Sequence, residues 1–122
     1  MITFDELREK TTPDIIKKMV ELAEGFEFVD CENGYFSIAI NGQEYGNIIT
    51  DEILFPLLLH RAVEGWNKDK KGEDCIVISD DNLVLWRADL DDCKVYDFKD
   101  YLPCHLTACE MAIMDCLIEV LK

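Results

Sequence analysis

The spacing of apolar positions over the first 25 residues predicts two short helices with a proline between them. Thr3 and Glu6 match a capping-box pattern, which favours a helix that begins directly after Thr3. Pro13 suits the first turn of a second helix, with Thr12 as its cap. The apolar residues of the second helix share one face because they recur every three or four positions. They are Ile15, Ile16, Met19, Val20 and Ala23.

The pattern then changes to the alternation that is typical of strands. Residues 26–31 and 35–40 flank an Asn-Gly pair at positions 33–34, which is the strongest short signal for a hairpin. A two-residue turn at this pair predicts Val29 opposite Ile38 on one face of the hairpin.

A second Asn-Gly pair, at positions 41–42, leaves two alternatives for residues 43–49. This segment is either a third strand or a plain loop that leads to the next helix. Of the two, we favour the strand.

A longer helix is predicted from Thr50 or Asp51 to about Trp66. Its apolar residues cover two adjacent stripes, so the helix must be packed on more than one side. The stripes are Leu54, Leu58 and Ala62, and Phe55, Leu59, Val63 and Trp66. The neighbours would be a sheet and either another helix or a second subunit. Homodimer formation is therefore one of our hypotheses, and a monomer mass by light scattering would contradict it.

Strand-like runs follow at residues 75–79 and 83–88, with a shorter one at 94–98. Pro103 precedes a final helix with a long apolar stripe. Its members are Leu106, Cys109, Ile113, Cys116, Leu117 and Val120. The elements therefore come in the order α-α-β-β-α-β-β-(β)-α. We predict one α+β domain over residues 1–122, with an antiparallel sheet of about four to five strands covered by helices.

Two segments in the second half of the chain carry a resemblance to a known group of proteins. Residues 55–65 read Phe-Pro-Leu-Leu-Leu-His-Arg-Ala-Val-Glu-Gly, and residues 107–113 read Thr-Ala-Cys-Glu-Met-Ala-Ile. With the strands between them, residues 50–122 resemble small uncharacterised phage and prophage proteins of the α/β/α-sandwich type. The shared feature is a hydrophobic pattern, and it brings no activity or catalytic residues with it. The resemblance implies an accessory protein of a mobile element.

The charge balance narrows the range of partners. The sequence holds 26 Asp and Glu against 12 Lys and Arg, for a net charge of −14 and a pI near 4.3. So negative a field repels nucleic-acid phosphates and anionic lipid, and it attracts basic partners. The one basic run, at residues 68–71, is interrupted by Asp69. We therefore expect a basic protein partner, and we expect neither nucleic-acid nor membrane binding.

The negative charge is not spread evenly along the chain. Residues 26–50 hold 4 acids and no base, and residues 73–101 hold 9 acids and 3 bases. These two strand-rich regions carry −10 of the total charge, so their turns are the surface on which we expect a partner. The acidic residues predicted to face it are Asp80, Asp81, Asp89, Asp91, Asp92 and Asp97.

Two further patterns predict a cytoplasmic protein with reduced thiols. The longest apolar run, at residues 53–59, is far shorter than the roughly 20 residues of a membrane span. Residues 1–10 lack the basic start and apolar stretch of a secretion signal. We therefore expect the six cysteines to be reduced and mostly buried rather than joined as a disulfide framework.

Candidate catalytic and metal-binding groups are few. The run Cys104-His105-x-x-x-Cys109 holds zinc-ligand types, but it lacks the paired Cys-x-x-Cys spacing of zinc sites. His60 and His105 are the imidazoles available to activate a nucleophile, and Cys104 and His105 would point in different directions on a helix. We therefore predict no catalytic, cofactor-binding or metal-binding residues.

The acidic turns offer a third kind of site, for a divalent cation. The runs Asp80-Asp81-Asn82 and Asp89-x-Asp91-Asp92 do not match the calcium loop of an EF-hand. Acidic turn residues kept apart by water explain them more simply.

The favoured hypothesis is a small acidic, non-catalytic interaction protein that binds a basic protein, with charge mimicry of DNA as a sharper version. The alternative is a small metal-binding protein or enzyme that uses the Cys, His and Asp residues above. Substoichiometric zinc in protein purified without chelators would contradict that alternative. The simplest explanation beneath both is an acidic domain whose charge serves solubility alone.

Overall fold

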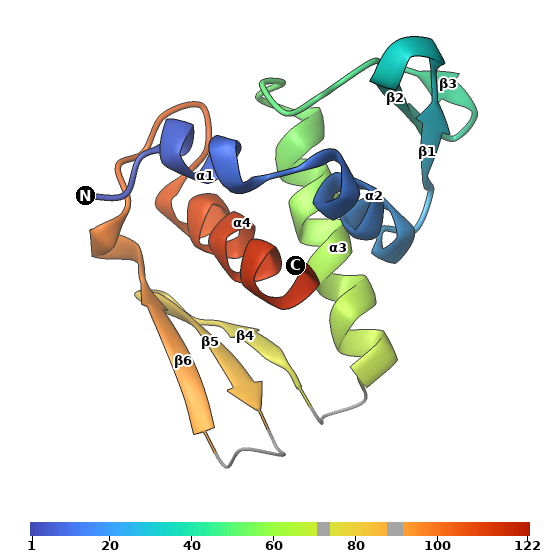
Figure 1. Cartoon of the computed structure of the whole chain (residues 1–122). Helices are drawn as coiled ribbons and strands as arrows, with labels where there is room; N and C mark the ends of the chain where they lie inside the picture. The colour runs from blue at the N-terminus through green and yellow to red at the C-terminus, as the bar shows by residue number, and fades with distance from the viewer. Residues whose placement is uncertain (71–73, 88–91) are drawn as a thin grey trace.

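Helix α4 (Ala108–Leu121) lies at the centre of the structure, with the other helices and small sheets around it (Figure 1). This computed structural model describes residues 1–70, 74–87 and 92–122. α4 begins at a capping box, because Thr107 and Glu110 each accept a hydrogen bond from the other's backbone amide. Its apolar side chains are buried on nearly every side, as in a helix inside a core. They are Met111, Ala112, Ile113, Met114, Cys116, Leu117, Ile118 and Leu121.

The two N-terminal helices begin at the predicted caps. α1 (Phe4–Lys10) follows Thr3, and α2 (Pro13–Leu22) follows Thr12. Each threonine hydroxyl accepts a hydrogen bond from a backbone amide of the first turn at 3.3 Å. None of the helices in the described ranges is long and apolar enough to cross a membrane.

α3 (Leu54–Lys70) is capped by Asp51, one of the two predicted starts. The Asp51 carboxylate accepts hydrogen bonds from the amides of Leu54 and Ile53 at 2.7 and 2.9 Å. These bonds hold the pKa of the Asp51 carboxyl below its usual range. Pro56 lies in the first turn, where its missing N–H leaves no gap in the helix.

The wide apolar arc of α3 is covered within the chain, by α2 on one side and by α4 on the other (Figure 1). The prediction of two-sided packing is confirmed, although both main neighbours are helices. Because α2 and α4 cover the two stripes, a homodimer would have to use a different surface.

Gly65 lies where α3 comes closest to α2. A methyl group at this position would lie 2.7 Å from the Leu22 carbonyl carbon and closer still to its oxygen. The obstacle is rigid backbone rather than the end of a flexible side chain. The helix crossing therefore leaves no room for any side chain at position 65.

β1 (Phe26–Asp30), β2 (Phe36–Ile40) and β3 (Gln43–Glu44) form the first antiparallel sheet. The second Asn-Gly pair makes the tight turn between β2 and β3, with positive φ at both Asn41 and Gly42. The favoured third strand is therefore present, although it is much shorter than predicted.

The register of the first hairpin differs from the prediction by one residue. Phe28, not Val29, pairs with Ile38. The Asn-Gly pair at 33–34 does adopt the expected positive φ values, but the chain before it contains one extra residue, Glu32, outside the ladder. An extra residue of this kind shifts the pairing by one position and reverses which side chains share a face.

β4 (Ile76–Ile78), β5 (Asn82–Arg87) and β6 (Asp92–Asp97) form a second antiparallel sheet in that order. This sheet packs on α4, whereas the first packs on α2, and the two lie at different corners of the molecule (Figure 1). The α+β class is confirmed, but the prediction of one sheet with four to five strands is wrong. The described strands form two three-stranded sheets, because alternation of apolar residues identifies strands without identifying their partners.

Candidate interaction surface

The second sheet has one face buried against helices, and its other face is uncovered among the described residues; the central side chains of both faces are apolar. Successive side chains of a strand point to opposite faces. The inner face packs against α3 and α4 and includes Ile76, Leu83, Leu85 and Tyr96. The other face, which we call the outer sheet face, consists of Val77, Val84, Trp86, Cys93 and Val95. An exposed apolar patch of this kind is typical of a surface that contacts another molecule.

The outer sheet face consists of two rows of side chains. Val77, Val84 and Val95 are direct partners across the three strands, and Trp86 and Cys93 form the next row. Trp86 is 53% exposed, Val95 48% and Val77 44%. Direct cross-strand neighbours lie about 5 Å apart, so these side chains make one continuous patch.

Three of the six predicted acidic residues lie at one end of the outer sheet face. Asp80 and Asp81 lie in the turn between β4 and β5 and are exposed. Asp97 pairs with Asn82 at the same end of the sheet, and the Phe98 amide donates to the Asp81 carbonyl at 3.0 Å. The fold therefore brings Asp80, Asp81 and Asp97 to one border of the patch.

Asp92 lies at the opposite end of the sheet, where it pairs with Arg87. Five residue steps along β5 separate the two ends, which is about 17 Å. The predicted residues Asp89 and Asp91 lie outside the described residues. The predicted acidic residues that the structure describes therefore lie at the two ends of the apolar patch and not across its centre.

The bases of this sheet belong to the inner side of the ladder. Lys94 pairs with Leu85, and its ammonium lies 5.1 Å from the centre of the Tyr96 ring. Arg87 alternates with the outer residue Trp86 and so faces inward as well. The outer sheet face is therefore apolar at its centre and acidic at the end that Asp80 and Asp81 form.

The two edges of the second sheet differ. Asn67 of α3 donates to the Ile76 carbonyl at 2.8 Å and accepts from the Ile76 amide at 2.7 Å, so α3 closes the edge of β4. β6 is the other edge, and the alternation of ladder bonds turns the backbone of Val95 away from β5. Such an edge can pair with an extended segment of another chain.

Charge along the sequence identifies the acids at the ends of the sheet but not the apolar face between them. A signal for that face was present, because residues 76–78 and 83–86 are apolar at every position. Continuous apolar strands are typical of sheets covered on both faces, whereas a sheet with one wet face alternates. Here only one face is covered within the described chain.

The prediction that the cysteines are mostly buried is wrong. Cys116 is buried, Cys75 and Cys109 are half-buried, and Cys31, Cys93 and Cys104 are exposed. Most cysteines have apolar neighbours in the sequence, but they lie at strand ends or in connections rather than in the core. No group of three or more His, Cys, Asp or Glu side chains within residues 1–70, 74–87 and 92–122 could hold a metal ion.

The structure brings together one pair of reactive groups that the sequence analysis separated. Cys104 Sγ lies 3.4 Å from His105 Nδ1. The expectation that these neighbours diverge assumed a helix, but α4 begins only after its cap at Thr107. The capping pattern of Thr107 and Glu110 was the sequence signal that places the pair outside the helix.

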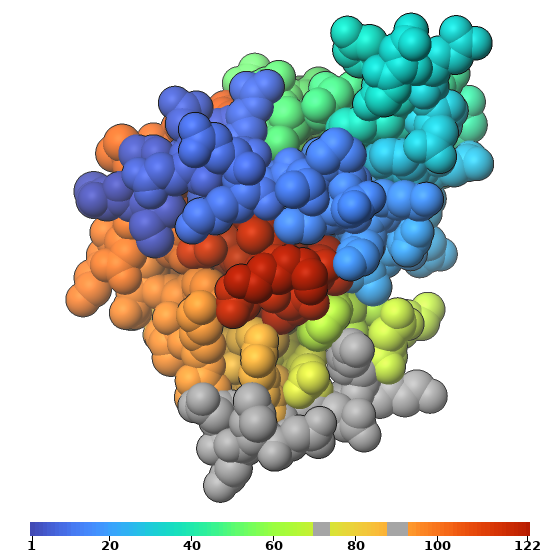
Figure 2. Space-filling view, in the orientation of Figure 1, coloured from blue at the N-terminus to red at the C-terminus, as the bar shows by residue number. Residues whose placement is uncertain are grey.

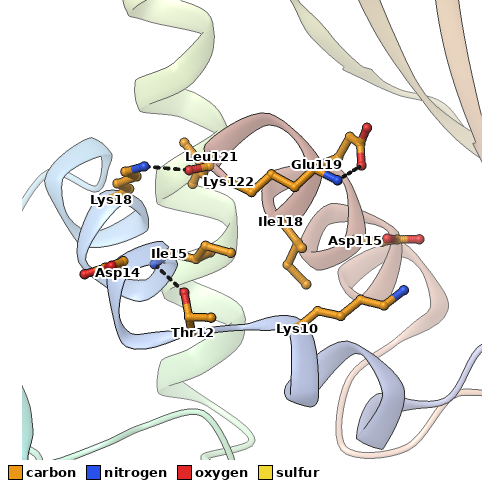
Figure 3. Close-up of a pocket in the computed structure, with 10 residues that line it drawn as sticks. All are labelled: Lys10, Thr12, Asp14, Ile15, Lys18, Asp115, Ile118, Glu119, Leu121 and Lys122. Atoms are coloured by element: carbon orange, nitrogen blue, oxygen red, sulfur yellow. Dashed lines mark hydrogen bonds and ion pairs between the residues drawn. The ribbon is translucent and has the colours of Figure 1, made fainter.

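A cavity of about 520 Å³ lies between the start of α2 and the end of α4 (Figure 3). α4 reaches the surface there, between the N-terminal helices and the second sheet (Figure 2). The charged residues of its lining are Lys10, Lys18, Lys122, Asp14, Asp115 and Glu119. Because the two signs balance, the lining favours neither an anion nor a cation.

Two of the three lysines in this cavity already have partners. Lys18 Nζ donates to the Leu121 carbonyl at 2.8 Å, and the Lys122 ammonium lies 3.3 Å from the Glu119 carboxylate (Figure 3). The first bond places a cation at the C-terminal end of α4, where the helix dipole favours it. We therefore interpret the residues that line the cavity as the contact that holds α2 to the end of α4.

Two weakly acidic side chains, Tyr101 and Cys116, are buried next to Asp115 of α4. The Tyr101 hydroxyl donates to the Asp115 carboxylate at 2.7 Å. Burial, and then this hydrogen bond, raise the pKa of Tyr101. Burial, and then the charge of Asp115, raise the pKa of the Cys116 thiol to about 12.

We expect the free energy of unfolding to fall as the pH rises above about 9, the range in which free thiols ionise. The unfolded chain releases the Cys116 proton there and the folded chain retains it, which costs about 1.4 kcal/mol per pH unit. Urea unfolding at pH 8 and pH 10 measures this loss. Cys116→Val should reduce the loss, whereas Cys31→Ser, at an exposed thiol, should not. The same loss in both variants would contradict the explanation.

The resemblance to phage proteins that we expect over residues 50–122 spans α3, the second sheet and α4, and it stays a prediction. Comparisons with protein-family models, with curated proteins and with solved structures gave no match.

Proposed function

We propose that this chain is a non-catalytic interaction protein that binds a basic protein through the outer sheet face. The observation that carries the proposal is the exposed apolar patch around Trp86 and Val95, with Asp80 and Asp81 at its border. An interface of this kind gains affinity from a buried apolar centre and from a polar rim that excludes wrong partners. The carboxylates would steer a basic partner and repel an acidic one.

The arrangement favours a partner that presents an extended segment. Such a segment could pair with the open edge of β6, where the backbone of Val95 points outward. Its apolar side chains would lie on the valines of the patch, and its basic side chains would reach Asp80, Asp81 or Asp97. Mimicry of DNA would instead require carboxylates along the whole face, and the apolar row from Val77 to Val95 interrupts any such array.

Capture of basic proteins from a lysate tests the proposal when the bait is compared with two variants of equal charge. The Asp80→Asn, Asp81→Asn variant removes two acids beside the patch. The Glu27→Gln, Glu44→Gln variant removes two exposed acids from the first sheet instead. We expect wild type and the second variant to retain the same basic protein, and the first variant to lose it.

The capture should also weaken as salt rises, because the attraction between exposed charges is screened. A third variant, Val77→Thr with Val95→Thr, keeps the charge and removes apolar surface, and it should lose the partner as well. The proposal fails if the three variants and wild type retain the same proteins, or if nothing basic is retained at low salt.

A further inference from the structure

We propose that Cys104 is a reactive thiol with His105 as its base, and that it forms mixed disulfides with small-molecule disulfides. The juxtaposition of Cys104 Sγ and His105 Nδ1 at 3.4 Å carries the proposal. A thiol within hydrogen-bonding reach of an imidazole is the arrangement that activates a cysteine. The site lies on the connection into α4, and the proposal is independent of the function proposed for the outer sheet face.

The backbone around Cys104 is held in place on both sides. On the N-terminal side, the Leu102 amide donates to the Ile2 carbonyl at 2.9 Å. On the C-terminal side, the Leu106 side chain is 1% exposed, and its carbonyl accepts from the Cys104 amide at 3.0 Å. The thiol is therefore presented from a fixed connection, which lies beside α1 (Figure 1).

The orientation of His105 leaves Nδ1 as the nitrogen that can exchange a proton with the thiol. The imidazole packs edge-on against Phe4 of α1, with ring centres 4.4 Å apart and planes at 85°. Its Nε2 is buried and has no hydrogen-bond partner among the described residues. Nδ1, by contrast, faces Cys104 Sγ.

A backbone amide also faces the sulfur atom of Cys104. The Leu106 amide donates a hydrogen bond to Cys104 Sγ at 3.5 Å, which holds the sulfur in place beside His105. Cys104 itself is exposed, so a small disulfide can reach it. Base, amide donor and access thus meet at one sulfur atom.

The reaction balances without any other reactant. His105 Nδ1 takes the proton from Cys104 Sγ, and the thiolate attacks one sulfur of the small disulfide. The new S–S bond forms as the old one breaks, and the leaving thiolate takes the proton from His105. One thiol and one disulfide are consumed, and one mixed disulfide and one small thiol are formed.

The rate of modification by hydroxyethyl disulfide, mapped to each cysteine by peptide mass, tests the proposal on the full chain. This probe is neutral, so the acidity of the protein does not bias it. Cys31 is the internal reference, because it is also exposed but its thiol lies beside the Val29 carbonyl rather than a base. A thiol without a base beside it is only a few per cent ionised near neutral pH, and this limits its rate of attack. Because His105 can take the proton of Cys104, we expect Cys104 to react about tenfold faster than Cys31.

His105→Gln should lower the rate at Cys104 to that of Cys31 and leave the rate at Cys31 unchanged. His60→Gln is the matched control, since the His60 imidazole contacts Glu110 rather than Cys104 and should change neither rate. A comparison of wild type before and after unfolding in urea needs no variant, and the tenfold difference should disappear in urea. Equal rates at the two cysteines in the folded wild-type chain, or an unchanged rate at Cys104 in the folded His105→Gln chain, would overturn the proposal.

Discussion

Gly65→Ala should lower the free energy of unfolding by about 3 kcal/mol, as overpacking against a fixed neighbour does. In an ordinary helix the same change raises stability by up to about 1 kcal/mol, because alanine is the better helix former. Here the added methyl group would collide with the backbone of Leu22, so α2 and α3 would have to move apart. Chemical denaturation of the two proteins measures the difference.

Glu64→Ala is the matched control for this prediction. It adds no atoms, and it changes an exposed residue on the same turn of α3. We expect it to alter stability by less than about 0.5 kcal/mol. If Gly65→Ala proved as stable as wild type or more stable, the close crossing of α2 and α3 would be wrong.

Asn67→Ala should lower the free energy of unfolding by about 2 to 3 kcal/mol and loosen the edge of β4. The Asn67 amide makes two hydrogen bonds to the backbone of Ile76, at 2.7 and 2.8 Å. Loss of the side chain leaves the Ile76 amide and carbonyl without these partners, and unpaired buried groups of this kind cost about 1 to 3 kcal/mol. Urea denaturation measures the loss, and hydrogen exchange of the Ile76 amide locates it.

Lys68→Ala provides the comparison, because Lys68 is the next residue of α3 and is exposed. It should leave both the stability and the exchange rate of the Ile76 amide close to wild type. Fast exchange of that amide in wild type would show that α3 does not close this edge of the sheet.

Features that depend on residues close in sequence were predictable. Thr3 and Thr12 cap the first two helices, and the Asn-Gly pair at 41–42 turns β2 into β3. Each of these structures is set by a side chain or a φ angle within a few positions of the turn. The same holds for Asp51, whose carboxylate bonds to the first amides of α3.

Features that depend on pairing between residues far apart in the sequence were not predictable. Glu32 lies outside the ladder, and this extra residue shifts the register of the first hairpin by one position. The Asn-Gly pair predicts the turn, but it does not reveal that the loop contains one more residue. The separation of the strands into two sheets depends on which helix each sheet packs against. Alternation of apolar residues along a strand carries no information about that choice.

The acidic end of the outer sheet face was predictable from charge alone, whereas its apolar centre was not. Charge counting identified Asp80, Asp81 and Asp97 as members of the acidic region, and the fold brings these three together. It could not identify the apolar patch between the ends of the sheet, because Val77 and Val95 look like core residues in the sequence. The contact between Cys104 and His105 was missed because both residues were assigned to a helix, and that helix begins only later in the chain.

Quenching of tryptophan fluorescence by acrylamide tests the central claim most directly. Trp86 is 53% exposed on the outer sheet face, whereas Trp66 is 9% exposed, so a neutral quencher reports mainly on Trp86. A peptide of alternating lysine and valine should cover Trp86 and reduce the quenching by acrylamide. Added salt should restore the quenching, because it screens the attraction between the peptide and the acidic residues. A peptide of alternating glutamate and valine is the control, and it should give no protection. Equal protection by both peptides, or by neither, would contradict the proposal that this face binds a basic partner.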